Sequence, residues 1–294
     1  MRRLLALLML LALLPCAAAE NTPAVPTVME LHQMMIGCAD GYLIRLGDLT
    51  IMIDGGNYNP DRPTERVQQY LWDAGVDTLD VHVITHWHLD HCMNLNLIMA
   101  EFGTADTVVY GPSAELHEDY VPLANGSYRQ MKQHDVIQLA NSRGEEITLT
   151  CIGPRKMKQD GRCNADSLNF LLQYGTRKVL FTGDHAASIE INEDYTELCR
   201  NVDILKFPHH ALKPFEIGAR AVRVVNPYFV LVPGNLEKKE IWQYVCRRLK
   251  MGNIYTNKDG HVVALTNGDD YIELRWEINP ADYAPGGQHA VAWN

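Results

Sequence analysis

The chain lacks several features that would place it in a specialised class of protein. Its 294 residues contain no internal repeat, charge block or low-complexity segment, and 47% of them are apolar, too many for a disordered chain. No two cysteines stand in a CxxC spacing, so a zinc site built from cysteines is not expected. Beyond the first nineteen residues, no apolar run is long enough to span a membrane. A globular domain with an ordinary core is the remaining interpretation.

Basic residues are also scarce. The 26 lysines and arginines face 36 acidic residues, which leaves a formal net charge of −10. A broad surface for nucleic acid is therefore not indicated, although a local patch stays open. We expect a small-molecule or phosphoester substrate, with nucleic acid as a less favoured partner. The residues of a candidate patch, which could equally be ordinary solvated charges, are Lys206, Lys213, Arg220 and Arg223.

Residues 1–19 have the pattern of a secretory signal peptide. Two arginines precede the apolar run Leu4–Leu14, and small residues up to Ala19 form a cleavage site. A lipoprotein signal using Cys16 is the alternative, but Pro15 fits it poorly. We therefore predict a secreted or extracytoplasmic protein that loses two arginines on cleavage near Ala19, so its charge moves from −10 to −12. Six of the seven cysteines would remain, and an oxidising compartment permits but does not require disulfides.

The rest of the chain predicts one α/β domain of two packed sheets over residues 29–278, after a leader at 20–28 and before a flexible tail at 279–294. Helices are expected at Pro63–Ala74, which Gly75 would end, and at Lys238–Arg248. The expected strands alternate with turn residues. They are Met29–Ile36, Gly41–Leu46, Leu49–Ile53, Val81–Thr85, Thr107–Tyr110, Ile147–Ile152, Ser167–Tyr174, Lys178–Phe181, Ile204–Phe207, Tyr228–Val232, Ile254–Tyr255, His261–Leu265 and Tyr271–Trp276.

A cluster of metal-ligand side chains directly follows the Val81–Thr85 strand. His86, His88, Asp90 and His91 fall within six residues, and imidazole and carboxylate ligands suit zinc while tolerating iron or manganese. Alternate residues point the same way, so His86 and His88 can share one ion while Asp90 and His91 turn toward a second. A polar loop with chance histidines is the alternative, but it is improbable with only 12 histidines in the chain.

This segment resembles the HxHxDH signature of the metallo-β-lactamase superfamily, and other motifs of that family follow in the right order. The resemblance implies a four-layer αββα sandwich. Asp54-Gly55-Gly56 resembles a motif whose aspartate orients the metal loop, Thr182-Gly183-Asp184 one whose aspartate bridges both ions, and Pro208-His209-His210 one that supplies the last histidine.

Within the superfamily, the chain most resembles the extracellular domains of ComEC-type competence proteins and related exported esterases. The likeness covers residues 29 to 275, and its central motif is the specific one. The segments that carry it are Ile36–Gly41, Asn164–Leu168, Tyr255-Thr256 and Gly260–Val262.

The resemblance implies two divalent metal ions, with zinc as the first choice. One ion would be bound by His86 and His88, which we call the first metal. The other, the second metal, would be bound by Asp90, His91 and His210, and Asp184 would bridge the two.

The resemblance also implies roles for residues around the ions. Asp54 would orient the ligand histidines, and Asp90 or a bound water would handle the proton. His209 would donate to a substrate oxygen, and the reverse assignment of His209 and His210 stays open. A metal-bound hydroxide would be the nucleophile.

The chain departs from the family at one ligand. Classical members carry a further histidine on the first metal, but the matching segment here, Asn164 to Ser167, has none. The first metal would then be weakly held, open to extra water, or completed by Asn164 or Asp166. His117 and His134 lie in the same interval without the motif, so a structural role is expected for both. Cys92, beside His91, is expected to pack in the interior, with metal ligation or a disulfide as alternatives.

The missing histidine favours hydrolysis of phosphoesters or phosphodiesters over that of lactams, lactones or thioesters. A non-catalytic metal-binding protein is a third hypothesis, but the intact set of six ligands counts against it. The redox diiron branch carries glutamate in place of His88, so oxygen reduction is not expected.

Overall fold

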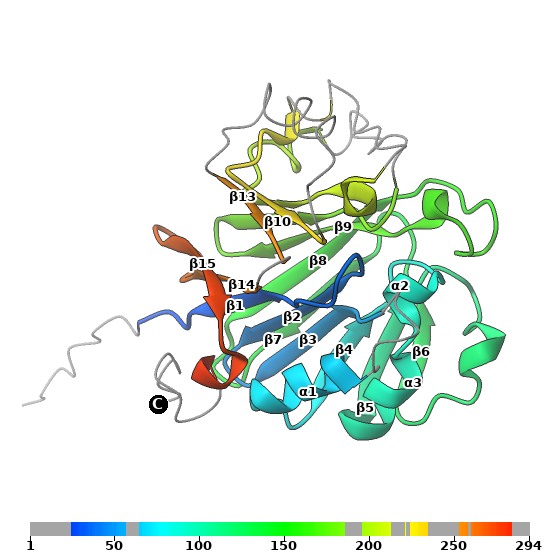
Figure 1. The fold of residues 1–294 in the computed structure, drawn as a ribbon. Helices are drawn as coiled ribbons and strands as arrows, with labels where there is room; N and C mark the ends of the chain where they lie inside the picture. The colour runs from blue at the N-terminus through cyan, green and yellow to red at the C-terminus, as the bar shows by residue number, and fades with distance from the viewer. Residues whose placement is uncertain are drawn as a thin grey trace, which may run out of the picture.

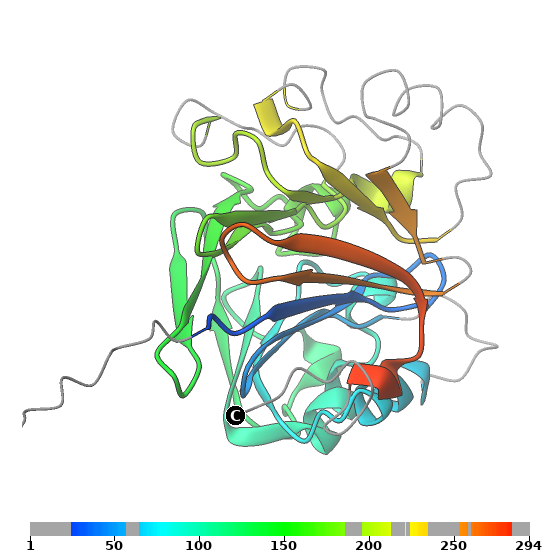
Figure 2. The same ribbon diagram turned by 90° about the vertical axis from the view of Figure 1, so that its left-hand side faces the viewer.

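The computed structural model describes residues 25–56, 65–185, 196–212, 221, 224–234, 253–257 and 260–283. Within these ranges two β-sheets pack face to face. The helices between residues 65 and 101 lie on the outer face of one sheet, and short helical segments that include Ala221 and Val225 pack on the outer face of the other (Figure 1 and Figure 2). The two-sheet α/β sandwich predicted from the sequence is confirmed. The predicted signal peptide, the Lys238–Arg248 helix and the end of the tail lie outside the described residues.

The first sheet has eight strands in the described chain, in the order β15-β14-β1-β2-β3-β4-β5-β6. Pairing is antiparallel from β15 to β3 and parallel from β3 to β6. The strands are β1 (Met29–Gln33), β2 (Gly41–Leu46), β3 (Leu49–Asp54), β4 (Leu79–Val83), β5 (Gly103–Gly111), β6 (Ser127–Gln130), β14 (His261–Thr266) and β15 (Ile272–Ile278).

The second sheet has seven described strands, in the order β13-β12-β11-β10-β9-β8-β7. Here β7 to β10 pair antiparallel and β10 to β13 pair parallel. The strands are β7 (Val136–Ala140), β8 (Glu146–Gly153), β9 (Asn169–Tyr174), β10 (Arg177–Phe181), β11 (Ile204–Lys206), β12 (Phe229–Val232) and β13 (Ile254–Thr256).

Local sequence explains the first half of the eight-stranded sheet. Leu46 pairs with Leu49 across a two-residue turn, and Gly47 at its first position has φ 65°, which suits the type II′ hairpin. The helix α1 (Glu65–Asp73) follows β3 and, as predicted, precedes Gly75, whose φ of 71° is the left-handed conformation that ends helices. The helices α2 (Leu89–Cys92) and α3 (Leu95–Glu101) connect β4 to β5.

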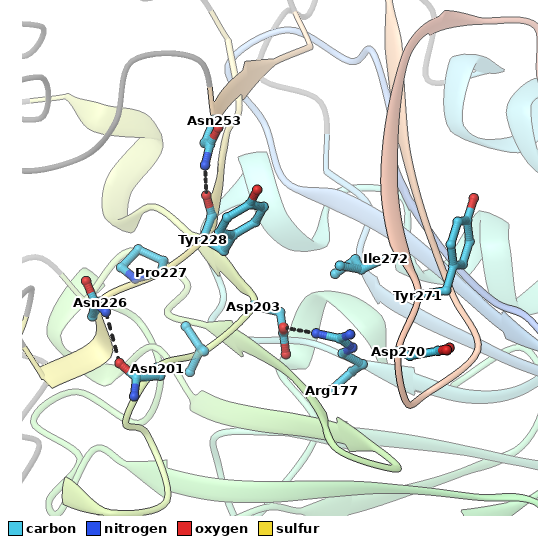
Figure 3. Close-up of a pocket in the computed structure, with 11 residues that line it drawn as sticks. Arg177, Asn201, Asp203, Asn226, Pro227, Tyr228, Asn253, Asp270, Tyr271 and Ile272 are labelled. Atoms are coloured by element: carbon cyan, nitrogen blue, oxygen red, sulfur yellow. Dashed lines mark hydrogen bonds and ion pairs between the residues drawn. The ribbon is translucent and has the colours of Figure 1, made fainter.

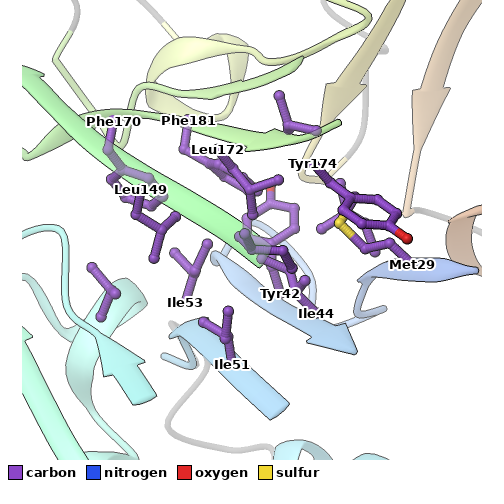
Figure 4. Close-up of a cluster of buried hydrophobic side chains, with 14 of the residues drawn as sticks. Met29, Tyr42, Ile44, Ile51, Ile53, Leu149, Phe170, Leu172, Tyr174 and Phe181 are labelled. Atoms are coloured by element: carbon purple, nitrogen blue, oxygen red, sulfur yellow. The ribbon is translucent and has the colours of Figure 1, made fainter. Parts of the chain in front are cut away.

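The main core lies between the two sheets, and Figure 4 shows side chains from both meeting there. A second cluster on the outer face of the eight-stranded sheet joins Met34 and Met52 to Tyr70 of α1 and Ile98 of α3. The eight-stranded sheet is therefore packed on both of its faces. The labelled residues of the main core are Met29, Tyr42, Ile44, Ile51, Ile53, Leu149, Phe170, Leu172, Tyr174 and Phe181.

No helix of the described residues is long and apolar enough to cross a membrane. A pocket of about 670 Å³ lies at the amino ends of β10 to β13, at the opposite end from the histidine motifs (Figure 3). Its wall includes the Arg177–Asp203 ion pair at 2.8 Å and a hydrogen bond from Asn226 to Asn201 at 2.9 Å.

His82 on β4 gives the fold a defined acid sensitivity. Its side chain is fully buried, and its Nε2–H donates to the main-chain oxygen of Asp54 at 2.9 Å. Burial lowers its pKa from 6.5 to about 4, against the smaller opposing effect of that hydrogen bond. The unfolded chain therefore binds a proton between these two pH values that the folded chain does not.

We expect this contribution to stability to be complete above pH 6.5 and to be lost as the pH falls toward 4. A shift of this size corresponds to roughly 3 kcal/mol of unfolding free energy. Urea unfolding of the chelator-treated protein from pH 7 to 4 tests this, because His82→Gln should flatten the slope. The exposed His134, changed to Asn, is the matched control and should leave the slope unchanged. Equal slopes for His82→Gln and wild type would contradict the prediction.

Candidate metal centre

The four predicted motifs meet at one edge of the sandwich. Asp54 ends β3, the Thr85–His91 segment follows β4, Asp184 follows β10, and Pro208–His210 follows β11. β3 and β4 are parallel neighbours, as are β10 and β11, so their carboxyl ends lie at the same edge. The structure therefore brings together residues that are up to 156 positions apart, from Asp54 to His210.

Four of the expected ligands form a compact group. Asp90, His91, Asp184 and His210 each offer one ligand atom, and these atoms all lie within 4.8 Å of one another. The Nε2 atom of His210 is 3.1 Å from Asp90 Oδ2 and 3.3 Å from Asp184 Oδ2. The Nε2 atom of His91 is 3.2 Å from Asp184 Oδ1. This group contains the whole expected ligand set of the second metal together with the expected bridge.

Two buried carboxylates hold the outward faces of these histidines. Asp54 accepts hydrogen bonds at 2.7 to 2.8 Å from Thr85 N–H, Thr85 Oγ1 and His91 Nδ1–H. Asp40, from the loop between β1 and β2, lies 3.4 Å from His210 Nδ1 and 3.6 Å from His91 Nδ1. Because a carboxylate only accepts, His91 keeps its Nδ1 proton for Asp54 and presents Nε2 to the group, whereas His210 Nδ1 lies near Asp40 without a hydrogen bond in the described chain. Asp54 thus lies where the sequence predicted a carboxylate that orients a ligand histidine, and Asp40 is a second carboxylate beside it.

Glycines allow the motifs to approach this closely. A Cβ at Gly56 would lie 2.1 Å from the main-chain carbon of Asp90 and 2.3 Å from the nitrogen of His91. A Cβ at Gly183, whose φ is 49°, would lie 2.7 Å from Cβ of Ser167. Side chains at either position would push the ligand segments apart.

The segment that carries the last histidine is strained. His209, His210 and Ala211 have φ values of 51°, 48° and 58°, and non-glycine residues adopt this region at a cost of about 1 kcal/mol each. The strained backbone separates the two histidines. His210 is buried among the carboxylates, whereas His209 Nε2 is 4.0 Å from Asp184 Oδ2 and its side chain is 18% exposed. The geometry fits His210 as the ligand and His209 as a group at the opening.

The expected ligands of the first metal are less tightly assembled. The ring of His86 is fully buried, with its centroid 4.1 Å from that of His91 and 4.5 Å from that of His88. His88 is partly exposed, and its Nε2–H donates to the main-chain oxygen of Arg162 at 3.2 Å. This half of the centre is the more open one.

The segment in place of the family's further histidine offers one candidate. Both carboxylate oxygens of Asp166 accept main-chain N–H groups at 2.6 to 3.0 Å, from Lys158, Gln159 and Gly161, so this side chain organises its own loop. Asn164 Oδ1 is buried without a hydrogen-bond partner in the described chain. Of these two side chains, only that of Asn164 keeps a buried acceptor without a partner there.

Lys206 is not part of a surface patch, and that expectation was wrong. Its side chain is 1% exposed, and its Nζ contacts Asp40 Oδ2 at 2.5 Å and donates to the Gly183 oxygen at 2.7 Å. The other three residues of the patch lie outside the described ranges. Sequence reasoning also missed Asp40 as a contact of the ligand histidines. A lysine between Leu205 and Phe207, in an apolar strand beside a histidine pair, was the available signal of a buried charge.

The carboxylates dominate the electrostatics of the centre. Burial opposes protonation of His91, but Asp184 and Asp54 outweigh it and raise its pKa to about 10. Burial also opposes ionisation of Asp184, yet His91 and His210 hold its pKa well below the usual range. In the metal-free chain, protonated histidines therefore neutralise these carboxylates. A bound cation would replace those protons as the positive charge beside the carboxylates.

Unsatisfied buried atoms show that the residues fit a metal ion. His86 Nε2, His91 Nε2 and Asp184 Oδ1 are buried and have no hydrogen-bond partner within the described ranges. Native proteins rarely leave such atoms unpaired, and their burial without a partner is costly. Nitrogen and oxygen donors of this kind suit zinc, iron or manganese.

Three further residues considered in the sequence lie outside the ligand group. Cys92 is buried and free, and its Sγ lies 3.2 Å from Tyr120 Oη, so the packing interpretation is confirmed over a disulfide. The Nδ1 atom of His117 accepts from the Asp119 N–H, and His134 is exposed on the surface. All five cysteines in the described ranges are free, and Cys246 lies outside them.

The comparisons with known proteins agree with this geometry. The model of the metallo-beta-lactamase superfamily matches residues 39–234, which are 196 of the 294 residues. No curated protein sequence matches the chain.

Among solved structures, the chain is similar to the metallo-beta-lactamase fold protein YhfI from Bacillus subtilis, with 14% identity, a TM-score of 0.52, and coverage of 84% of this chain and 100% of that one. It is also similar to human tRNase Z, short form, with 14% identity, a TM-score of 0.45, and coverage of 69% and 91%. The diiron β-hydroxylase CmlA from Streptomyces venezuelae has 16% identity, a TM-score of 0.44, and coverage of 70% and 44%.

Proposed function

Because the chain belongs to the metallo-beta-lactamase superfamily, we propose that it is an exported hydrolase with two metal ions that cleaves phosphoester or phosphodiester bonds. The observation that carries the proposal is the group of Asp90, His91, Asp184 and His210, whose ligand atoms lie within 4.8 Å. The resemblance of its motifs to those of ComEC-type domains supports the phosphoester class, and the pattern of residues 1–19 supports export.

Each ligand residue has an assigned place in this proposal. His86 and His88 would hold the first metal, Asp90, His91 and His210 the second, and Asp184 both. Asn164, with its unpartnered Oδ1, is the candidate that would complete the first. Zinc is the ion proposed, with manganese or iron as the alternatives.

The chain's own residues then prepare the reaction. Divalent ions supply Lewis acidity and lower the pKa of coordinated water. Asp54 accepts the Nδ1 proton of His91 and Asp40 lies 3.4 Å from His210 Nδ1, so the Nε2 atoms of both histidines would be available to an ion. Asp90, whose side chain is 18% exposed, lies where a proton can be accepted and passed to solvent. His209 lies at the opening, where its ring N–H can donate to a substrate oxygen.

A pocket beside the centre favours a small phosphoester over nucleic acid. It measures about 720 Å³ and includes Trp87 and Arg162, which flank and contact His88 respectively. Neighbouring phosphates of a polymer would meet acidic side chains there, which is unfavourable beyond the net charge of −10. The acidic residues of the wall are Glu115, Glu118 and Asp160.

A substrate panel tests this function. The zinc-loaded protein should hydrolyse bis-p-nitrophenyl phosphate or p-nitrophenyl phosphate faster than duplex DNA or a chromogenic lactam. His88→Ala should lower that rate by at least ~100-fold, because removing a ligand should cost more than the roughly 10- to 100-fold lost when a residue that supports a ligand is removed. His134→Asn, the exposed control histidine, should keep it. Lactam turnover without phosphoester turnover would contradict the proposed substrate class.

A further inference from the structure

Lys206 is an unusual residue for the interior of a metal centre. It ends β11, two positions before Pro208, and is among the largest fully buried side chains of the protein. Its Nζ contacts Asp40 Oδ2 at 2.5 Å and the Gly183 oxygen at 2.7 Å, and it lies 3.6 Å from Asp184 Oδ1. An ammonium group is thus placed directly behind the expected bridging carboxylate.

This lysine keeps its charge. Burial alone would favour the neutral amine, but its Nζ forms an ion pair with the buried Asp40, which is not an expected metal ligand, and this favours the ammonium. Asp40 in turn reaches both ligand histidines through their Nδ1 atoms. The ammonium is therefore connected to the centre by its charge and by the carboxylate that it shares.

The charges of the centre can be counted. The carboxylates of Asp40, Asp54, Asp90 and Asp184 carry four negative charges and Lys206 carries one positive charge, which sum to −3. Two divalent ions add four positive charges, so the loaded centre would carry +1 when its histidines and its bound water are neutral, and zero with a bound hydroxide. Without the lysine, each of these sums is one unit lower.

We propose that Lys206 is a fixed third cation of the metal centre, a positioning residue that makes the loaded centre one unit more positive than it would be without the lysine and so favours an anionic substrate group. The inference rests on the proposed function and deepens it, since the phosphate of a phosphoester is such a group. At the effective dielectric constant of a protein, one unit charge about 10 Å from a bound anion changes the affinity for that anion by roughly tenfold.

The test measures binding of inorganic phosphate to the zinc-loaded protein by calorimetry, with zinc content determined in parallel. Lys206→Met should retain two ions and bind phosphate at least about tenfold more weakly than wild type. The double variant Lys206→Met/Asp40→Asn loses one charge of each sign, so it should regain most of the wild-type affinity. Lys178→Met is the matched control, because its ammonium donates to the main-chain oxygens of Leu198 and Arg200, away from the centre.

The effect of the lysine charge can also be measured in variants that lack the Asp40 carboxylate, which Lys206→Met would leave buried without its partner. If Lys206→Met does not fold or loses an ion, Asp40→Asn is compared with the double variant, and Asp40→Asn should bind phosphate about tenfold more tightly. Unchanged phosphate affinity in Lys206→Met with two ions bound would overturn the inference, as would a double variant as weak as Lys206→Met. Wild-type protein that holds two ions but binds no phosphate would instead contradict the proposed substrate class.

Discussion

Replacing Asp184 with asparagine should remove most of the bound metal and lower phosphoester hydrolysis by at least ~100-fold. Its two oxygens lie 3.2 Å from His91 Nε2 and 3.3 Å from His210 Nε2, so both oxygens face ligand nitrogens. An amide offers one oxygen and no charge, and it cannot bridge two cations. Elemental analysis after dialysis against buffer without metal, together with the rate on bis-p-nitrophenyl phosphate, measures both effects.

A control separates this effect from a loss of folding. Asp203 stands directly before β11, at the opposite end of the second sheet, where it pairs with Arg177 at 2.8 Å. Asp203→Asn should therefore keep both metal and activity. Full metal content and rate in Asp184→Asn would show that this residue does not bridge the ions.

The second large effect is expected at Asp54. Its carboxylate accepts hydrogen bonds from Thr85 N–H, Thr85 Oγ1 and His91 Nδ1–H, all within the buried interior. Asparagine can satisfy the threonine, but its amide nitrogen cannot accept from His91. We expect metal affinity to fall by about 10- to 100-fold and the free energy of unfolding by about 1–3 kcal/mol.

Competition with a chromogenic chelator measures the affinity of Asp54→Asn, and urea unfolding of the metal-free protein measures its stability. Asp80 supplies the comparison, since its carboxylate accepts the Thr50 N–H at 2.7 Å on the same sheet without touching a ligand histidine. Asp80→Asn should lower stability only. If Asp54→Asn holds metal as tightly as Asp80→Asn, Asp54 does not orient the centre.

The sequence predicted the strands that carry strong patterns. Gly41–Leu46 is a strand with these bounds, and Leu49–Ile53 is extended by one residue to Asp54. β6 and β7 were missed, because Ser127–Gln130 has one apolar residue and Val136–Ala140 lies at the edge of its sheet, with Val136 58% exposed. Such strands are defined by pairing with β5 and β8, which local sequence does not encode.

The site divides in the same way. The HxHxDH segment and the motifs at Asp54, Asp184 and His210 could be identified because each carries its residue type at a fixed place after a strand. Asp40 and Lys206 could not, because their importance comes from contacts between β11 and the loop before β2. Lys206 was expected at the surface although its neighbours are apolar, and only the fold shows which carboxylates surround the ammonium.

These contacts also describe an asymmetric centre. The proposed site of the second metal has four candidate ligand atoms within 4.8 Å and two buried carboxylates behind its histidines. The proposed site of the first has a buried His86 and a partly exposed His88, with the unpartnered oxygen of Asn164 as a further candidate. An open first metal beside the pocket of Trp87 and Arg162 is where a phosphoester could enter.

The central claim is that this edge of the sandwich binds two metal ions. A crystal of the zinc-loaded protein, measured on both sides of the zinc absorption edge, tests it most directly. The account predicts two anomalous peaks, one bound by His86 and His88 and one by Asp90, His91 and His210, with Asp184 shared between them. The absence of any peak among these residues, or zinc bound only elsewhere on the protein, would contradict it.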